Sequence, residues 1–264
     1  MTFLFLGTGG SAGIPMVGCS CAVCKGGMEH NQRLRPSGLL KLGGKTLLID
    51  PGPDLRLQAL KYEIDKIDGV LITHTHFDHV GGLDELRTYY LLHGQIMPCL
   101  VSLPTLEGLK NRYDYLFAEK TWGKSLAAQL YFQVLEGERG STEFLQTKVN
   151  YVSYMQGSCP VNGFRFGSFA YISDIRKYPE TIFEDLEGVE ILVLSAVREA
   201  PSQMHLSFEE GIAFSKRVGA KKTYFTHISH DTDHDTANKK LPKGVQLAYD
   251  GLTLDLCMKT SELI

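Results

Sequence analysis

The sequence carries little net charge and no long hydrophobic run. Its 264 residues contain 27 Lys and Arg against 30 Asp and Glu, a formal net charge of -3. This balance gives no bulk attraction for nucleic acid or anionic membranes, although it leaves a local basic groove open. The start MTFLFLGTGGSAG lacks the basic region and the longer apolar segment of a signal peptide, and no later run reaches the roughly 18 apolar residues of a membrane span. We therefore expect a cytoplasmic protein without a membrane partner.

Internal repeats, low-complexity segments and linker-like stretches are also missing, so we predict a single domain over residues 1–264. Short apolar runs alternate with glycine-rich turns and helical patterns, which predicts a mixed α/β fold. Helices are expected over 84–92, 103–117 and 207–218, the last beginning with a Ser207/Glu210 capping box. Strands are expected in TFLFLGTG, LLKLGGKTLLIDPG (a hairpin turning at GG), DGVLITH, CLVSL, AAQLYFQVL, TKVNYVSY, GFRFGSFAYISD, EILVLSAV, KKTYFTHI and VQLAYDGLTLDL.

Cysteine is scarce, with six in the chain, yet three of them lie in the stretch GCSCAVC. In a reducing compartment such a cluster indicates metal binding before disulfides. Cys19, Cys21 and Cys24 can surround one ion because Gly18 lets the loop turn back on itself. A tetrahedral zinc site needs a fourth ligand, and three incidental thiols are the alternative. The other cysteines, at positions 99, 159 and 257, stand alone and are expected to be buried small apolar residues.

The strongest chemical signal is THTHFDHVGG, which follows an apolar run ending at Ile72. It places four ligand-type residues within six positions: His74, His76, Asp78 and His79. On an extended turn the first two project the same way, and the other two turn toward a second point, so one loop can supply ligands to two ions. The alternative is a polar turn of hydrogen-bonded imidazoles.

An HxHxDH motif after a buried strand resembles the signature of metallo-β-lactamase-fold hydrolases. The likeness extends to LFLGTGGSAGIP, GCSCAVC, RLRPSGLL, LLIDPGPDLR, YISD, YFTHISHD and LAYDGLTLDL. Together these segments resemble the PhnP-like branch, whose namesake is a phosphodiesterase that cleaves cyclic phosphoribosyl substrates. The resemblance implies an αββα sandwich, two mixed sheets flanked by helices, with a metal site in a cleft at one edge of the sheets.

The same resemblance implies roles for residues outside the motif. His227 would join the cleft metals, and His230 would complete a Cys3His structural zinc site; a surface imidazole, or His234 as a rival ligand, are the alternatives. Asp174 would bridge two cleft metals, where a lone aspartate at a strand end is otherwise a turn former. His205 would be the general acid, with a helix-capping role as its alternative.

One position departs from the family pattern. The first cleft metal normally takes a third histidine from an HG pair, and the corresponding stretch YMQGSCPVNGFRFG has Gln156 before Gly157. A neutral amide oxygen is a weaker ligand than imidazole, so this site is expected to be loosened, to prefer manganese over zinc, or to stay empty. His93 is unassigned, and we expect it at the surface rather than as a replacement ligand.

These parts predict a metal-dependent phosphodiesterase for small or cyclic phosphodiesters, with one or two zinc or manganese ions activating the attacking water. Asp78 would orient this water, and His205 would protonate the departing alcohol. A thioester or lactam hydrolase of the same fold stays open, as does a catalytically weakened metal-binding protein because of Gln156. A tRNA endonuclease, and nucleic acid as a partner, have little support because no long Lys/Arg-rich insertion is present. A homodimer stays open.

Overall fold

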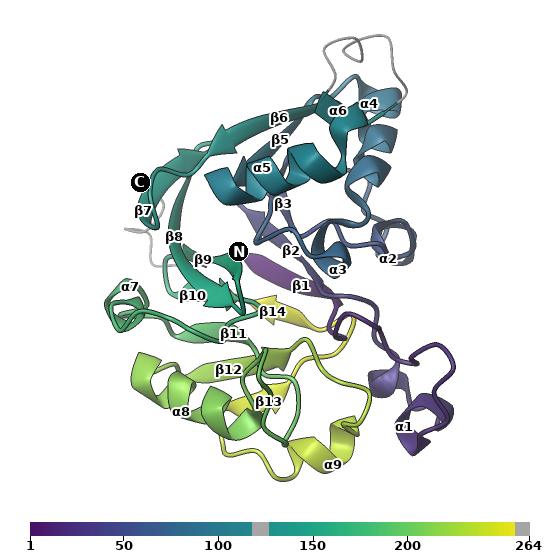
Figure 1. Ribbon diagram of the computed structural model, residues 1–264, viewed down its shortest axis with the longest axis vertical. Coiled ribbons are helices and arrows are strands. Elements are labelled where there is room, and N and C mark those ends of the chain that lie inside the picture. Colours follow the sequence, from purple (N-terminus) through teal and green to yellow (C-terminus); the bar gives the residue numbers. More distant parts are fainter. Residues whose placement is uncertain (118–126, 257–264) are drawn as a thin grey trace.

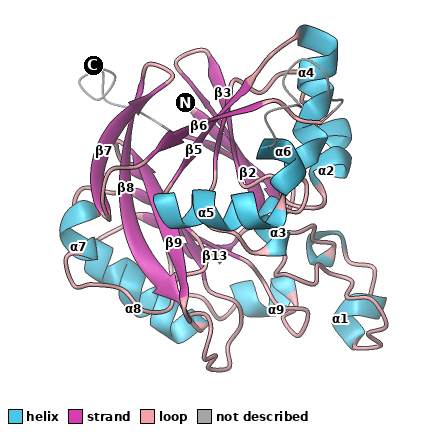
Figure 2. Ribbon diagram, turned by 45° about the horizontal axis from the view of Figure 1, so that its top comes forward, coloured by secondary structure: helices cyan, strands magenta, loops and turns pink. Residues whose placement is uncertain are grey.

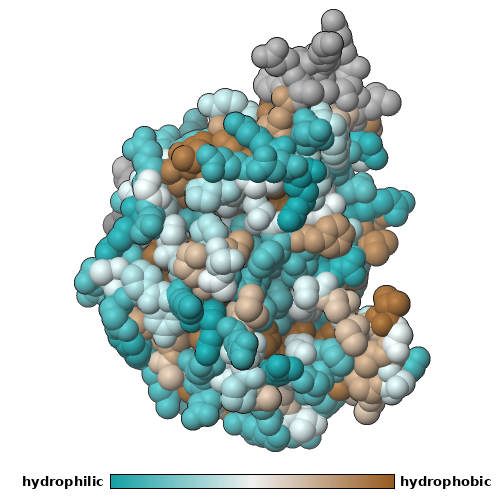
Figure 3. Space-filling view, viewed as in Figure 1, coloured by the Kyte–Doolittle hydropathy of each residue, from teal (hydrophilic) through white to brown (hydrophobic). Residues whose placement is uncertain are grey.

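The computed structural model describes residues 1–117 and 127–256. Two seven-stranded sheets stack face to face, and helices cover their outer faces (Figures 1 and 2). The predicted αββα sandwich of two mixed sheets flanked by helices is therefore confirmed. The face seen in Figure 3 is mostly hydrophilic, with hydrophobic residues in small separate patches. Within 1–117 and 127–256, none of the helices has the length and apolar character needed to cross a membrane.

The first sheet has the order β14-β1-β2-β3-β4-β5-β6. Its strands β3 to β6 are parallel, and β14, β1, β2 and β3 pair antiparallel. In that order the strands are Thr253–Asp255, Thr2–Gly7, Ser37–Leu42, Lys45–Ile49, Gly69–Leu71, Met97–Val101 and Leu130–Val134.

The second sheet has the order β13-β12-β11-β10-β9-β8-β7, with β10 to β13 parallel and β7 to β10 antiparallel. In that order the strands are Val245–Leu247, Lys222–Thr226, Ile191–Ser195, Phe169–Ile172, Cys159–Phe166, Thr147–Gln156 and Arg139–Phe144.

Helices lie on both sides of the paired sheets, α2 to α6 against the first sheet and α7 and α8 against the second (Figures 1 and 2). The α-helices α1 to α9 are Ala22–Lys25, Leu55–Lys61, Phe77–Val80, Arg87–His93, Leu103–Arg112, Asp114–Phe117, Ile182–Asp185, Phe208–Val218 and His234–Asn238, and two 3-10 helices span Glu29–Asn31 and Leu83–Leu86.

The period of two in β1 explains the layering. Phe3 and Phe5 point into the apolar layer between the sheets, where both are almost fully buried, while Leu4 and Leu6 belong to the layer beneath α2, α4 and α5. A third apolar layer separates the second sheet from α7 and α8. Fixed between three such layers, the strands hold the loops at their ends in place.

Several local predictions agree with the structure and others need correction. The GG hairpin joins β2 and β3, with Gly43 and Gly44 at φ of 57° and 75°, values that suit a tight turn with glycine at both positions. The helix expected over 84–92 is a 3-10 turn followed by α4, and the one over 103–117 breaks at Tyr113 into α5 and α6. Strand β7 was missed, because RGSTEF is mostly exposed at a sheet edge and shows no apolar alternation.

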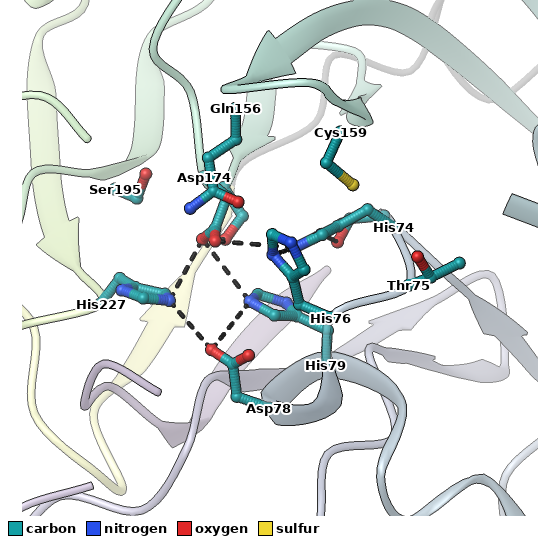
Figure 4. A network of polar contacts seen from close by, with 12 residues as sticks. His74, Thr75, His76, Asp78, His79, Gln156, Cys159, Asp174, Ser195 and His227 are labelled. Carbon is teal, nitrogen blue, oxygen red and sulfur yellow. Dashed lines mark hydrogen bonds and ion pairs between the residues drawn. The ribbon is translucent and has the colours of Figure 1, made fainter. Parts of the chain in front are cut away.

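The expectation for the lone cysteines is met in part. Cys99 is fully buried, and this burial holds the pKa of its thiol well above the ordinary value. Cys159 is instead partly exposed and lies beside the histidine motif (Figure 4). Cys257 lies outside the described residues.

Candidate metal centre

The side chains predicted for the cleft meet at one end of the sandwich, although they are spread from position 74 to position 227. The loop after β4 and the short helix α3 supply four of them, and single residues come from the ends of β8, β10 and β12 (Figure 4). They are His74, His76, Asp78, His79, Gln156, Asp174 and His227. Ligands from both sheets can converge here because these strands end at the same edge.

Two clusters of ligand atoms share one carboxylate. In the first, His74 Nε2 lies 2.9 Å from His76 Nδ1 and 3.6 Å from Asp174 Oδ2. In the second, Asp78 Oδ2 lies 3.4 Å from His79 Nε2 and 3.2 Å from His227 Nε2. The other oxygen of Asp174, Oδ1, lies 3.5 Å from His79 Nε2 and 3.3 Å from His227 Nε2. Asp174 thus presents one oxygen to each cluster.

These contacts fit metal ions better than direct hydrogen bonds. Charge-assisted N–H···O bonds are usually about 2.7–2.9 Å long, and these imidazole–carboxylate distances are 3.2–3.6 Å. His79 Nε2 is buried and has no hydrogen-bond partner within the described residues. A buried nitrogen without a hydrogen bond, facing two carboxylates, is what a metal ligand requires. The donor set of imidazoles and carboxylates suits zinc and manganese.

A second layer of residues fixes which nitrogen of each imidazole faces the cleft. Asp50 Oδ2 accepts hydrogen bonds from His79 Nδ1, at 2.7 Å, and from the Thr73 hydroxyl, at 2.7 Å. Because that hydroxyl has only one hydrogen, its oxygen must accept from His74 Nδ1, at 2.9 Å. Both rings therefore keep a proton on Nδ1 and turn Nε2 toward the cluster atoms, as a metal ligand requires.

Asp50 and Thr73 were not identified as functional residues from the sequence. The available signal was LLIDPG, in which an aspartate directly follows a buried strand, but its role depends on the neighbouring strand. Asp50, Asp174 and His227 also adopt positive φ values of 61°, 52° and 63°. Such conformations are costly for residues other than glycine, and three of them at one site indicate that the fold holds these side chains at fixed angles.

The buried charges shift the pKa values in opposite directions within the site. Burial, helped by the nearby His79, holds the pKa of His74 well below its ordinary value, so His74 is neutral and ready to bind an ion. Burial also disfavours charge on His79 and His227, but the carboxylates of Asp174 and Asp78 outweigh it and raise both pKa values. Metal binding by these two imidazoles must therefore displace protons.

His205 and Gln156 contact each other at the edge of this site. Gln156 Nε2 lies 3.0 Å from His205 Nε2, and the His205 ring lies 4.7 Å from that of His227 between centroids. Burial, together with the charge on His227, lowers the pKa of His205 to about 4, away from the ordinary value assumed from the sequence. Gln156 Oε1 is buried without a partner in the described part of the chain, next to Asp174 (Figure 4).

The cysteine cluster forms a second centre, in which the sulfurs of Cys19, Cys21 and Cys24 gather around His230. His230 Nδ1 lies 3.5 Å from the first sulfur and 3.6 Å from the second. Tetrahedral zinc with bonds of about 2.3 Å to sulfur and 2.0–2.1 Å to nitrogen requires an S···N separation of roughly 3.5 Å. The four donors thus fit a closed Cys3His site.

Further contacts favour the thiolate of Cys21, whereas burial raises the pKa of Cys24. His230, followed by the backbone N–H of Cys24, lowers the pKa of Cys21 to about 6, which favours the thiolate that a metal binds. The alternative ligand His234 lies elsewhere: its Nδ1 faces the Arg33 guanidinium at 2.9 Å. His93 is the exposed last residue of α4, as expected.

Comparisons with known proteins agree with this geometry. A family model described as a beta-lactamase superfamily domain matches residues 45–228. A solved structure described as a new diphosphatase from the PhnP family is 38% identical and has a TM-score of 0.88; the match covers 97% of this chain and 98% of that one.

Two curated relatives differ in name and length. The octanoyltransferase of Porphyromonas gingivalis is 32% identical over 264 residues, which cover 96% of this chain and 51% of that protein. The chain therefore spans about half the length of this relative. The anti-Pycsar protein Apyc1 of Paenibacillus harenae is 27% identical over 238 residues, covering 83% of this chain and 91% of the relative.

The family model covers more than half of the chain, and the PhnP-family structure matches nearly all of it. The sandwich and the two ligand clusters around Asp174 agree with both matches. This chain belongs to the metallo-β-lactamase superfamily.

Proposed function

We propose that this protein hydrolyses phosphodiester bonds in small or cyclic substrates, with one or two zinc or manganese ions in the cleft and a structural zinc in the Cys3His cluster. The main support is the position of Asp174, whose two oxygens face different ligand clusters. A carboxylate shared in this way suits two ions about 3.5–4 Å apart, an arrangement common in enzymes that cleave phosphate esters.

Ions held by these residues would supply Lewis-acid stabilisation of charge on the phosphoryl oxygens and would lower the pKa of a water molecule toward neutrality. Asp78 would orient the attacking water through its carboxylate, which already lies between His79 and His227. His74 and His79 would keep Nε2 toward the cleft because Thr73 and Asp50 hold their Nδ1 protons.

His205 would assist the departing oxygen. Its lowered pKa leaves the ring neutral before substrate binds. A phosphoryl anion beside the ring would offset this effect, because a negative charge favours the protonated imidazole. The protonated ring could then transfer its proton to the leaving alkoxide. Gln156 Nε2 would orient the neutral ring by donating to His205 Nε2, and protonation of that nitrogen would require the amide to turn its oxygen toward it.

Hydrolysis of a diphosphate is a second candidate, supported by the full-length likeness to a protein described as a diphosphatase of the PhnP family. The same groups would act on a P–O–P linkage, with a phosphate in place of an alkoxide as the leaving group.

The test is a substrate panel with metal analysis on the same preparation. Metal-loaded protein should hydrolyse bis(p-nitrophenyl) phosphate or a 2′,3′-cyclic nucleotide faster than p-nitrophenyl phosphate, a thioester or a β-lactam. Asp78→Asn, which removes a ligand and the water-orienting carboxylate, should abolish this activity and so exclude a contaminating phosphodiesterase. If the loaded protein cleaved the thioester or the lactam but no phosphodiester, the proposal would be wrong.

A further inference from the structure

We propose that a cavity beside His205 binds a second anionic group of the substrate, carried by the leaving group, and that Arg198 is its cationic residue. This inference rests on the proposed function, because it assigns a substrate class to that reaction: phosphodiesters or diphosphates whose leaving group bears a further phosphate or carboxylate.

The cavity lies between the cleft and the Cys3His cluster. It has a volume of about 260 Å³, below the range of pockets that enclose drug-sized ligands, so it suits one small group. His205 and His227 line it from the cleft, and His230 lines it from the cysteine cluster. The remaining lining residues come from two loops, Gly10 to Gly13 and the segment after β11, together with Ile228 and Ser229.

The Arg198 guanidinium can donate hydrogen bonds to a ligand in this cavity. Its side chain is 38% exposed, and within the described residues its one ion-pair contact is a long one, from Nη1 to Asp231 Oδ2 at 3.5 Å. Its Nε is buried and has no hydrogen-bond partner in the described part of the chain. The planar guanidinium fork matches the oxygens of a phosphate or a carboxylate. An anion in the cavity would accept from the exposed part of this side chain, not from the buried Nε.

The rest of the lining favours the same chemistry. None of the lining residues, all of which lie within the described ranges, is acidic. In the Gly10–Gly13 turn, the Gly13 N–H donates to the Gly10 carbonyl and the Gly10 N–H to Ile228. The N–H groups of Ser11 and Ala12 donate to no acceptor in the parts of the chain that are described. Backbone N–H groups and serine hydroxyls are common partners of anions.

The position of His205 determines which end of the substrate enters the cavity. One of its ring nitrogens lies within 4.8 Å of ligand atoms of Asp174 and His227, and it also lines the cavity. The oxygen that His205 protonates must therefore lie at the mouth of this cavity. A group attached to that oxygen extends into it, so the cavity binds the part of the substrate that carries the leaving oxygen; in a cyclic diester this part stays attached to phosphorus through its other ester oxygen.

The experiment uses two diesters that differ in one charge, methyl 3-carboxyphenyl phosphate and methyl 3-carbamoylphenyl phosphate, whose leaving phenols are of similar basicity. The metal-loaded protein should show a kcat/KM about ten-fold higher for the carboxylate, as expected of a charged hydrogen bond. Arg198→Gln should bring the ratio of the two kcat/KM values close to one. Arg139→Gln is the control, since Arg139 pairs with Glu184 and Asp185 outside the cavity, and it should keep the preference.

Equilibrium binding provides a readout that does not depend on turnover. Arg198→Gln should weaken the binding of inorganic diphosphate to the metal-loaded protein about ten-fold or more, and that of inorganic phosphate far less, because only diphosphate reaches both the metals and the cavity. If neither diester were hydrolysed, the proposed function would fail. The diphosphate-binding measurement would then decide by itself whether the subsite exists. Equal diphosphate affinity in the wild type and Arg198→Gln, or an unchanged ester preference, would overturn the subsite.

Discussion

Replacing Asp50 with asparagine tests whether the residues behind the ligands control metal binding. In the wild type, Asp50 accepts three hydrogen bonds, from the Thr73 N–H, the Thr73 hydroxyl and His79 Nδ1. Asparagine has one oxygen and one NH2 group, and cannot accept all three. If its oxygen kept the Thr73 N–H, the NH2 would face His79 Nδ1 and force that proton onto Nε2. His79 could then no longer bind a metal.

The other orientation of the asparagine amide at position 50 is also unfavourable. With the oxygen toward His79, the NH2 group faces the buried Thr73 N–H, and a buried donor without an acceptor costs about 1–3 kcal/mol. Loss of such a supporting partner typically lowers metal affinity about 10- to 100-fold, which corresponds to about 1.4–2.7 kcal/mol. We expect Asp50→Asn to lose affinity in this range at the second cluster, which holds His79.

The assay is metal retention per chain after dialysis of loaded protein against increasing chelator, with the Cys3His ion as an internal reference. Asp68→Asn is a matched control, because Asp68 also accepts a backbone N–H, from Thr46, and pairs with Lys66, but lies outside the site. Circular dichroism would establish that both variants are folded. Release of the cleft metal at the same chelator concentration from folded Asp50→Asn and wild type would refute the reasoning.

Four further predictions follow from the two centres. Cys21→Ser should release one metal ion per chain and lower the Tm, because metal binding is coupled to folding; unchanged metal content and Tm would exclude the Cys3His site. His205→Ala should reduce kcat about 10²- to 10⁴-fold for an alkoxide leaving group and far less for nitrophenolate; equal losses would indicate another role. Gln156→His should raise the cleft metal content toward two ions and reduce the dependence of activity on added metal, and wild type that already retains two cleft ions would contradict this. Because the pKa values of His79 and His227 are raised above the ordinary value of about 6.5, metal affinity should increase as the pH rises from about 6.5 toward these raised values, since binding must displace both protons. The same protons stabilise the metal-free fold below the unfolded pKa of about 6.5, and this stabilisation should fade as the pH rises through the folded values. Metal affinity that is flat over this range would show that these imidazoles are already neutral.

Ligands that are close together in the sequence could be predicted from it, because one short loop fixes their separation. This holds for His74, His76, Asp78 and His79, and for the three cysteines of GCSCAVC. The layered fold could also be predicted from the sequence. Apolar periodicity specifies strands and helices, and the family resemblance implied their arrangement. Elements without that periodicity, such as the exposed edge strand β7, could not be predicted because their residues do not alternate between apolar and polar.

Only the tertiary structure decided which distant residues meet. Asp174 faces both clusters because β10 ends beside the loop that follows β4, and His230, not His234, reaches the cysteines because Arg33 holds the other ring. The pKa of His205 likewise depends on burial and on the charge of His227, neither of which sequence spacing specifies. The sequence by itself determined the ligand types and their local spacing; sheet order and burial determined their partners, orientation and charge, because those properties arise between residues far apart in the chain.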